Sequence, residues 1–249
     1  MTPDELDRYA RHIVLREIGG PGQAKLRRAR VLVIGAGGLG CPALLYLAAA
    51  GAGTLGIVDD DRVSLSNLQR QVLFRTEDIG RPKVDAAADA IARLTPHVSV
   101  ERHAQRLGED ATELISAYDL ILDGTDNFAT RYAVNRACVA AGKPLLSAAM
   151  TQWEGQISLY DPAHGGPCYA CVFPEAPAEG LAPSCAEAGI MGALAGVMGS
   201  MMAGEAIKQI TGAGDGLRGT MLIYDALYAD VRRMGVRQRA DCPACGSAA

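Results

Sequence analysis

The sequence predicts an α/β protein built on a doubly wound, Rossmann-like and mostly parallel sheet. Short apolar runs, typical of strands buried on both faces, alternate with helical patterns. A glycine-rich turn follows the first run, and an acidic residue follows the second. Of the 249 residues, 49% are apolar and 21% are charged, which is enough apolar material for a large core and argues against disorder.

The expected elements fall into three parts of one domain. Residues 1–30 form a helical arm and a lead-in, with apolar positions at helical spacing over residues 3–18. Residues 31–150 form a nucleotide-binding core, with strands at 31–34, 54–58, 99–103, 120–123 and 144–149 and helices at 42–50, 82–94 and 131–141. Residues 151–249 are expected to be less regular, with a strand at 155–160, a proline-rich surface loop at 174–183 and a small-residue helix within 188–204.

Charge and hydropathy exclude several classes of partner. The net charge is -4 and no run of basic residues is present, so we expect no nucleic acid. The uncharged stretch 188–204 contains five glycines and is short for a membrane span, so we expect no membrane insertion. The polar, acidic N-terminus carries no export signal, which favours a cytoplasmic location.

The glycine-rich turn indicates a nucleotide site. Gly35, Gly37 and Gly40 satisfy G-x-G-x-x-G between a strand and a helix, where backbone N–H groups and a helix N-terminus hold phosphate. Asp59, at the end of the second strand, is placed to bind ribose hydroxyls. Alone, this pattern also fits a turn that only packs helix on sheet, or a nicotinamide or flavin site.

Polar residues beyond Asp59 favour a triphosphate over a dinucleotide. Asn67 and Arg70 are followed by Lys83, which the preceding proline places in the first turn of a helix. A cation at that end of a helix opposes the helix dipole, which is understandable if an anion lies between them. Asp126 follows the strand at 120–123, and a carboxylate beside phosphates suggests Mg²⁺.

Two C-x-x-C pairs predict a metal site. Cys168, Cys171, Cys242 and Cys245 supply four thiolates, a complete tetrahedral set for structural zinc; a redox role for either pair is the alternative. An odd total of seven cysteines argues against a disulfide framework. The remaining three are expected to differ: two, Cys41 and Cys138, pack within helices, and Cys185, after the proline-rich loop, is a bystander or a reactive thiol.

Taken together, these motifs resemble the ThiF/MoeB/HesA family, bacterial relatives of the ubiquitin-activating enzymes, from about residue 6 to residue 245. The resemblance rests on these residues, in order: Arg8, Tyr9 and Arg11; the glycine turn; Asp59 and Asp61; residues 66–71; Lys83; residues 124–128; residues 154–156; and the paired cysteines. It implies ATP-dependent adenylation of the C-terminal Gly-Gly carboxylate of a ubiquitin-like sulfur-carrier protein, which prepares that carboxylate to become a thiocarboxylate.

Roles follow from the resemblance by matching positions. ATP would be bound by Gly35, Gly37, Gly38, Gly40, Asp59, Ser66, Asn67, Arg70, Lys83, Asp126 and Asn127. Arg70, Lys83 and Asp126 would act in catalysis, with Mg²⁺ on Asp126. Arg11 resembles an arginine that reaches ATP in trans from the other subunit of a homodimer. Cys185 aligns with a loop cysteine that takes part in sulfur transfer in the thiamine branch of the family.

Several alternatives stay open at this level. The motifs do not separate a molybdopterin carrier from a thiamine carrier, and we favour the former. The chain ends four residues after Cys245, so we expect a separate protein to donate the sulfur. An NAD-dependent oxidoreductase and a catalytically silent scaffold are the rival functions. An oxidoreductase would give no role to Arg70, Lys83 and Asp126, and a silent scaffold would not need these residues intact.

Overall fold

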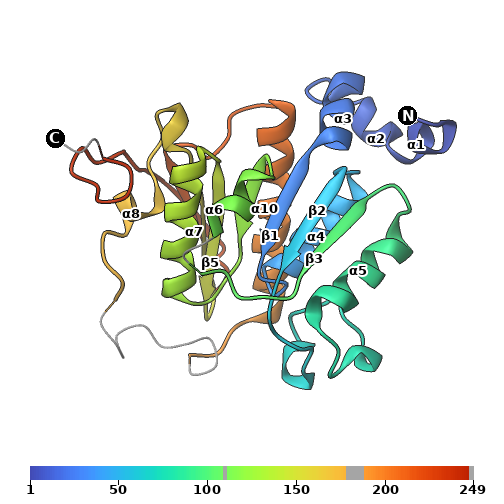
Figure 1. Ribbon diagram of the computed structural model, residues 1–249, viewed down its shortest axis with the longest axis horizontal. Helices are drawn as coiled ribbons and strands as arrows, with labels where there is room; N and C mark the ends of the chain where they lie inside the picture. Colours follow the sequence, from blue (N-terminus) through green and yellow to red (C-terminus); the bar gives the residue numbers. More distant parts are fainter. Residues whose placement is uncertain (109–110, 178–187, 247–249) are drawn as a thin grey trace.

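The computed structural model describes residues 1–108, 111–177 and 188–246, and in this part of the chain the predicted fold class is confirmed (Figure 1). One sheet has the strand order β3-β2-β1-β4-β5-β6-β7-β8. Five strands are parallel: β1 (Arg30–Ile34), β2 (Thr54–Val58), β3 (Ser99–His103), β4 (Leu120–Asp123) and β5 (Leu145–Thr151). Three antiparallel strands extend it: β6 (Glu154–Tyr160), β7 (Thr220–Asp225) and β8 (Asp230–Gly235).

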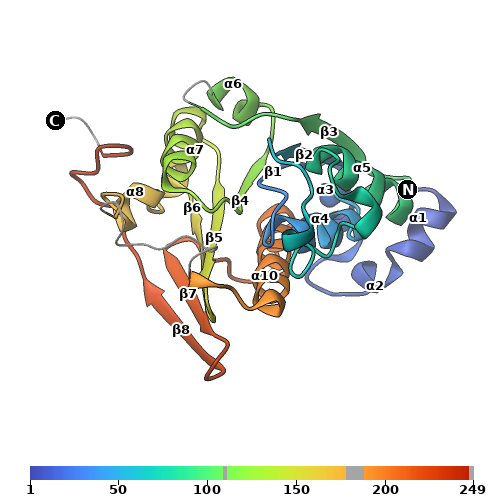
Figure 2. The same ribbon diagram turned by 90° about the horizontal axis from the view of Figure 1, so that it is seen from below.

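Helices cover both faces of the sheet (Figure 2). One face is covered by α4 (Gly40–Ala49), α5 (Lys83–Leu94) and α10 (Gly192–Thr211). The other face is covered by α6 (Ala111–Ser116), α7 (Phe128–Ala141) and α8 (Tyr169–Val172). Short 3-10 turns occur at η1 (Leu65–Asn67), η2 (Thr76–Asp78) and η3 (Pro162–His164).

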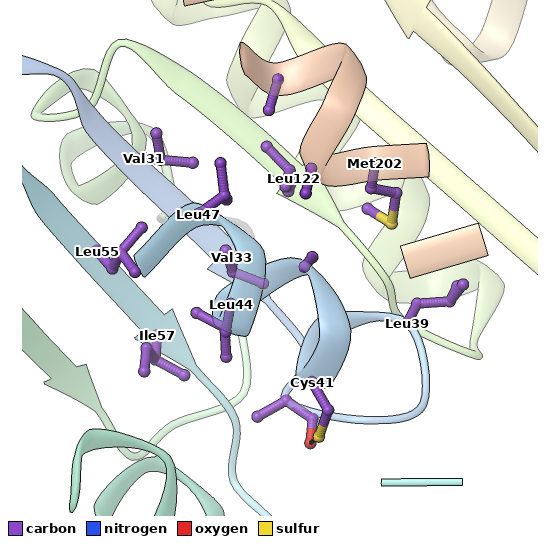
Figure 3. Packing of buried hydrophobic residues seen from close by; sticks show 14 of the residues in the cluster. Val31, Val33, Leu39, Cys41, Leu44, Leu47, Leu55, Ile57, Leu122 and Met202 are labelled. Carbon is purple, nitrogen blue, oxygen red and sulfur yellow. Dashed lines mark hydrogen bonds between the residues drawn. The ribbon is translucent and has the colours of Figure 1, made fainter. Parts of the chain in front are cut away.

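The apolar run of β1 is explained by burial on two faces. Val31 and Val33 belong to the core beneath α4 and α10, whereas Leu32 and Ile34 belong to the core beneath α6 and α7. Because successive strand residues point to opposite faces, a strand covered on both sides must be apolar throughout. Figure 3 shows the first of these cores, where Leu44 and Leu47 of α4 pack on strand residues and Met202 of α10 lies beside them.

The N-terminal arm differs in detail from its prediction. The segment 3–18 is divided at Tyr9 into α1 (Pro3–Arg8) and α2 (Ala10–Ile13), and the glycines at 19–22 begin a further helix, α3 (Gly19–Arg28). A Cβ at Gly22 would lie 3.0 Å from Ile18 Cγ2 and 3.4 Å from Thr211 Cγ2, so this glycine allows α3 to approach the end of α10 closely. The glycine-rich sequence therefore serves helix packing here.

The C-terminal part is more regular than the sequence indicated. It contributes the 20-residue helix α10 and the β7–β8 hairpin to the shared fold. Leu194, Met198 and Met202 of α10 are buried, and Gly199 packs directly against the carbonyl of Leu39 and the ring of Pro42. Within the described residues, none of the helices combines the length and the apolar character needed to span a bilayer. Residues 178–183 of the expected loop, and Cys185, lie outside the described residues.

Candidate nucleotide cleft and cysteine cluster

A cleft of about 1310 Å³ lies at the carboxyl ends of the parallel strands, where doubly wound folds bind ligands. It brings together residues that the sequence separates by more than one hundred positions. Those named above as candidate site residues and found in its lining are Gly35, Gly37, Gly38, Asp59, Asn67, Arg70, Lys83, Asp126 and Asn127. Lining residues also come from β5, β6 and α8.

The glycine turn is fixed by close backbone contact. Gly35 has φ +88°, and a Cβ on Gly40 would clash with the carbonyl oxygen of Gly35, so both positions require glycine. The N-cap residue of α4, Leu39, makes no side-chain capping hydrogen bond. Within the first turn of α4, Cys41 N donates to Gly37 O at 2.9 Å and Pro42 has no N–H. The turn residues Gly37 and Gly38, which line the cleft just before the helix, are therefore the groups suited to meet an anion there.

Asp59 supports this turn from inside the protein. Its carboxylate accepts hydrogen bonds from the backbone N–H of Ala36 (2.8 Å) and of Asp61 (2.8 Å). Its side chain is 7% exposed, and this burial raises the pKa of the Asp59 carboxyl although Lys83 opposes the rise. Asp59 therefore has a structural role in the turn in addition to the ribose contact predicted for it.

Lys83 already has carboxylate partners. It is the first residue of α5, it is buried, and its Nζ lies 2.7 Å from Asp61 Oδ2 and 3.7 Å from Asp59 Oδ1. Sequence reasoning gave Asp61 no role, although the spacing Asp59-x-Asp61 was visible. The two aspartates hold the ammonium group of Lys83 at the wall of the cleft, where this group can also contact a phosphate.

The segment after η1 brings one cation and one unpaired amide to the cleft. Arg70 is half-buried, and its Nη1 donates to the backbone oxygen of Ser66 at 3.1 Å. Gln71 is 3% exposed, and its Oε1 is buried with no hydrogen-bond partner among the described residues. Leaving a buried polar group unpaired is costly, so this amide fits a cleft that is completed by a polar ligand.

At the end of β4, two aspartates have different environments. Asp126 is exposed in the cleft lining, as a ligand for a hydrated cation would be. Asp123 is fully buried: it accepts from Ser147 Oγ at 3.0 Å and lies 3.6 Å from the guanidinium of Arg131. Arg131 also donates to backbone oxygens of Thr125 and Ala148, so it ties the ends of β4 and β5 together beneath the cleft.

Three of the predicted site residues lie outside the cleft lining, and Asn127 has a second contact. Ser66 and Gly40 do not line the cleft. Asn127 lines the cleft but also caps α7, its Oδ1 accepting from Thr130 N at 2.9 Å. Arg11 is exposed on α2, in the arm beside the start of β1 (Figure 1), whereas the cleft lies at the other end of that strand.

The paired cysteines converge into one cluster, as predicted. The Sγ atoms of Cys168, Cys171, Cys242 and Cys245 all lie within 4.8 Å of one another, and three Sγ–Sγ distances are 3.8, 3.5 and 3.4 Å. Four thiolates at metal–sulfur distances of about 2.3 Å in a tetrahedron would lie about 3.8 Å apart. The donor set therefore fits a tetrahedral metal ion.

One thiol of the cluster is poised to be a thiolate. Burial acts against ionisation, but backbone hydrogen bonds from Ala244 and Cys245 lower the pKa of Cys242 to about 7. Thiolates are the form that binds metal, so the backbone favours the ligand form of this residue at neutral pH. Cys41 and Cys138 are instead buried in α4 and α7, which confirms that they pack within helices.

Comparison with known proteins agrees with the geometry. The model of the ThiF family matches residues 9–244. The chain belongs to the ThiF family. It is an enzyme of the nucleotidyltransferase type.

Three relatives illustrate the likeness. A sulfur carrier protein adenylyltransferase of Thermus thermophilus is 50% identical over 98% of this chain and 92% of its own length. The probable adenylyltransferase/sulfurtransferase MoeZ of Mycobacterium tuberculosis is 49% identical over 98% of this chain, which spans only 63% of that relative. The crystal structure of E. coli MccB with MccA-N7isoASN has a TM-score of 0.86 at 23% identity, over 96% of this chain and 75% of that one, and shows the shared fold.

Proposed function

We propose that the chain transfers AMP from ATP to the C-terminal carboxylate of a ubiquitin-like sulfur-carrier protein. The observation that carries this proposal is the cleft, in which the glycine turn, Arg70, Lys83 and Asp126 face one space. The name of the Thermus relative, a sulfur carrier protein adenylyltransferase, supports the substrate class. The cleft continues along β5 and β6 through Thr151 and Gln156, which leaves room for an extended peptide end beside the nucleotide.

The chemistry requires positioning rather than a nucleophile from the enzyme. A carboxylate oxygen of the carrier attacks the α-phosphorus and forms a P–O bond, while the bond to the oxygen that bridges to the β-phosphate breaks and pyrophosphate leaves with the electron pair. Charge accumulates on phosphate oxygens, and fixed donors at those oxygens stabilise the transition state. Arg70 and Lys83 would supply the charge, and the glycine turn before α4 the backbone donors.

Asp126 is the residue that would hold Mg²⁺. Its exposed carboxylate is an oxygen ligand of the type that this ion prefers. A bound Mg²⁺ would neutralise phosphate charge. Ser66, Gly40 and Asn127 are proposed to act indirectly, by shaping the backbone around the nucleotide.

We further propose that the metal of the cysteine cluster is Zn²⁺, in a structural role. Four sulfur ligands leave no open coordination position, which is typical of structural zinc. The cluster would tie the C-terminal tail to α8. Zinc content measured on protein purified without chelator, near one ion per chain, supports this assignment, and content far below one opposes it.

A homodimer would explain the position of Arg11. Because the arm lies at the opposite edge from the cleft of its own chain, Arg11 is proposed to act in trans at the partner's cleft. Two apolar surfaces support self-association. Val14 and Leu15 of the arm are 75% and 47% exposed. The open face of α10 carries Val197, 37% exposed, and Gly196, at which an added Cβ would meet none of the residues that the structure describes within 4 Å.

Subunit mixing tests the trans assignment. Homodimers of Arg11→Ala and of Asp126→Ala are expected to be nearly inactive. Random mixing makes half of the dimers hybrid, and each hybrid has one complete site, so activity should return to about a quarter of wild type. If exchange is verified and no activity returns, Arg11 does not act in trans.

The identity of the carrier can be tested by ATP–pyrophosphate exchange. We propose a molybdopterin-branch carrier, with a thiamine-branch carrier as the alternative. Each purified carrier is offered with Mg·ATP, and the control is the same carrier without its last two glycines. Exchange only with the intact molybdopterin carrier supports the proposal. Exchange with the thiamine carrier alone reassigns the branch, and no exchange with any carrier overturns adenylation.

A further inference from the structure

One buried amide, that of Asn135, joins the cysteine cluster to the wall of the cleft. Asn135 lies on α7, the helix whose first residues Asn127 and Phe128 border or line the cleft, and it is 1% exposed. Its Nδ2 donates to Cys168 Sγ at 3.7 Å, and its Oδ1 accepts from the backbone N–H of Tyr169 at 2.8 Å. The amide thus donates to a sulfur of the cluster, on Cys168, and accepts from the backbone of the residue that follows it, Tyr169.

The N–H···S contact has a clear electrostatic role if a divalent metal is bound. Four thiolates around a dication leave a net negative charge, and hydrogen-bond donors that point at the sulfurs offset it. Other donors also reach the cluster: Arg239 N to Cys171 Sγ at 3.4 Å, Gln238 Nε2 to Cys245 Sγ at 3.7 Å, and the backbone N–H groups of Ala244 and Cys245 to Cys242. Gln238 is exposed, so Asn135 is the buried side chain that provides such a donor among the described residues.

The acceptor end of the amide supports the cleft. Tyr169 lines the cleft, and its ring packs edge-on against Tyr132 (5.3 Å between centroids) and Tyr160 (5.6 Å) and is tilted over Phe173 (4.9 Å). Tyr132 OH also donates to Phe173 O at 2.8 Å. The α8 segment that carries Cys168 and Cys171 therefore also carries two cleft-lining aromatic rings, and α7 holds it at Tyr132 and Asn135.

We propose that Asn135 is a positioning residue that fixes Cys168 in the metal centre and Tyr169 in the cleft wall with one side chain. The inference rests on the proposed metal at the cysteine cluster and goes beyond it, since it assigns a second function to α8. Metal occupancy and the shape of the cleft wall are thereby coupled through a single hydrogen-bonded group.

Two variants separate the two ends of the amide. Asn135→Asp keeps an acceptor for Tyr169 N–H but replaces the donor to Cys168 with an oxygen. Asn135→Ala removes both contacts. Val134→Ala, a fully buried change on the same helix that leaves Asn135 in place, is the matched control for loss of packing. Each protein is compared by the rate of zinc release to a colorimetric chelator and by the thiolate-to-metal absorption of the Co²⁺-substituted form.

We expect zinc release to be about 10- to 100-fold faster in both Asn135 variants, the range found when an outer partner of a metal ligand is lost. Their Co²⁺ charge-transfer bands should shift, whereas Val134→Ala should lower the unfolding temperature and leave both readouts unchanged. Asn135→Ala should also raise KM for ATP or carrier more than Asn135→Asp does.

Three results would overturn the inference. Release rates and Co²⁺ spectra of both variants that match wild type would show that the amide does not position the sulfur. An equal change in Val134→Ala would reduce Asn135 to general packing. Wild-type protein that holds neither zinc nor Co²⁺ would remove the metal centre and this inference with it, while adenylation, measured separately, would still stand.

Discussion

The nucleotide cleft and the cysteine cluster lie along the same helix, α7, but are held together in different ways. The cleft is formed at the ends of hydrogen-bonded parallel strands, and its buried cation Lys83 is held by an ion pair with Asp61. The cluster joins Cys171 to Cys242, across 70 intervening residues, and the tail from 236 to 246 has no helix or strand of its own. Regular structure thus arranges the first site, whereas the proposed metal would complete the second.

The largest expected effect concerns the cleft. Arg70→Ala should lower the adenylation rate roughly 100- to 1000-fold, which corresponds to a loss of about 3 to 4 kcal/mol of transition-state stabilisation. The reason is that a fixed cation beside the phosphates stabilises the negative charge that develops on their oxygens in the transition state. Arg102→Ala, which breaks an exposed pair with Asp85, is the matched control and should leave the rate unchanged. A rate for Arg70→Ala within a factor of two of wild type would show that the residue is misassigned.

The cluster should respond in stability instead. Cys242→Ser removes one ligand of the proposed metal. When free metal is present at one hundred times its Kd, its binding stabilises the folded state by about 2.7 kcal/mol, and the variant should lose much of this stabilisation. We expect a lower unfolding temperature for this variant and, after chelator treatment, for wild type. Calorimetry with and without chelator measures both. If chelator leaves the unfolding temperature of metal-loaded wild type unchanged, the tail is held by something other than the metal.

The smallest expected effect is a pH dependence of stability that comes from the buried carboxylate of Asp59. Burial raises the folded-state pKa of Asp59, so between the unfolded pKa of 3.8 and the higher folded pKa the native protein binds more protons than the unfolded chain. The free energy of unfolding therefore falls as pH rises through that window, by about 1.4 kcal/mol for each pH unit that the window spans. Asp59→Asn should lose this dependence. The free energy of unfolding of both proteins is measured by urea denaturation at several pH values in the window. The same pH dependence in both proteins would contradict the assignment of this effect to Asp59.

Much of the cleft could be predicted because its signals are local. The apolar runs of β1 and β4, the glycine turn and the acid after β2 each identify an element without knowledge of its neighbours. Parallel strands bring their carboxyl ends to one edge of the sheet, so the acids that follow β2 and β4, Asp59 and Asp126, line the same cleft. The cysteine cluster was predictable for another reason: few arrangements other than a metal site need two C-x-x-C pairs.

The missing parts depend on tertiary contacts. β8 is exposed along its whole length and carries Arg232 and Arg233, so it has no apolar alternation to reveal it. The glycines and proline at 19–22 are residues that usually interrupt a helix, and only the fold shows that Gly22 packs against Ile18 and against Thr211 of α10. Asn135 is a polar residue in an otherwise ordinary helix pattern, and only the fold shows that it meets Cys168.

The most direct test of the central claim follows the phosphate itself. The protein is mixed with a carrier that ends in Gly-Gly and with ATP labelled either at the α- or at the γ-phosphate, and the reaction is stopped in acid before the carrier is isolated. Adenylation predicts that the α-label appears on the carrier, that the γ-label leaves as pyrophosphate, and that Arg70→Ala removes the signal. Carrier labelled from the γ-phosphate, or unlabelled carrier with every intact candidate, would contradict the account.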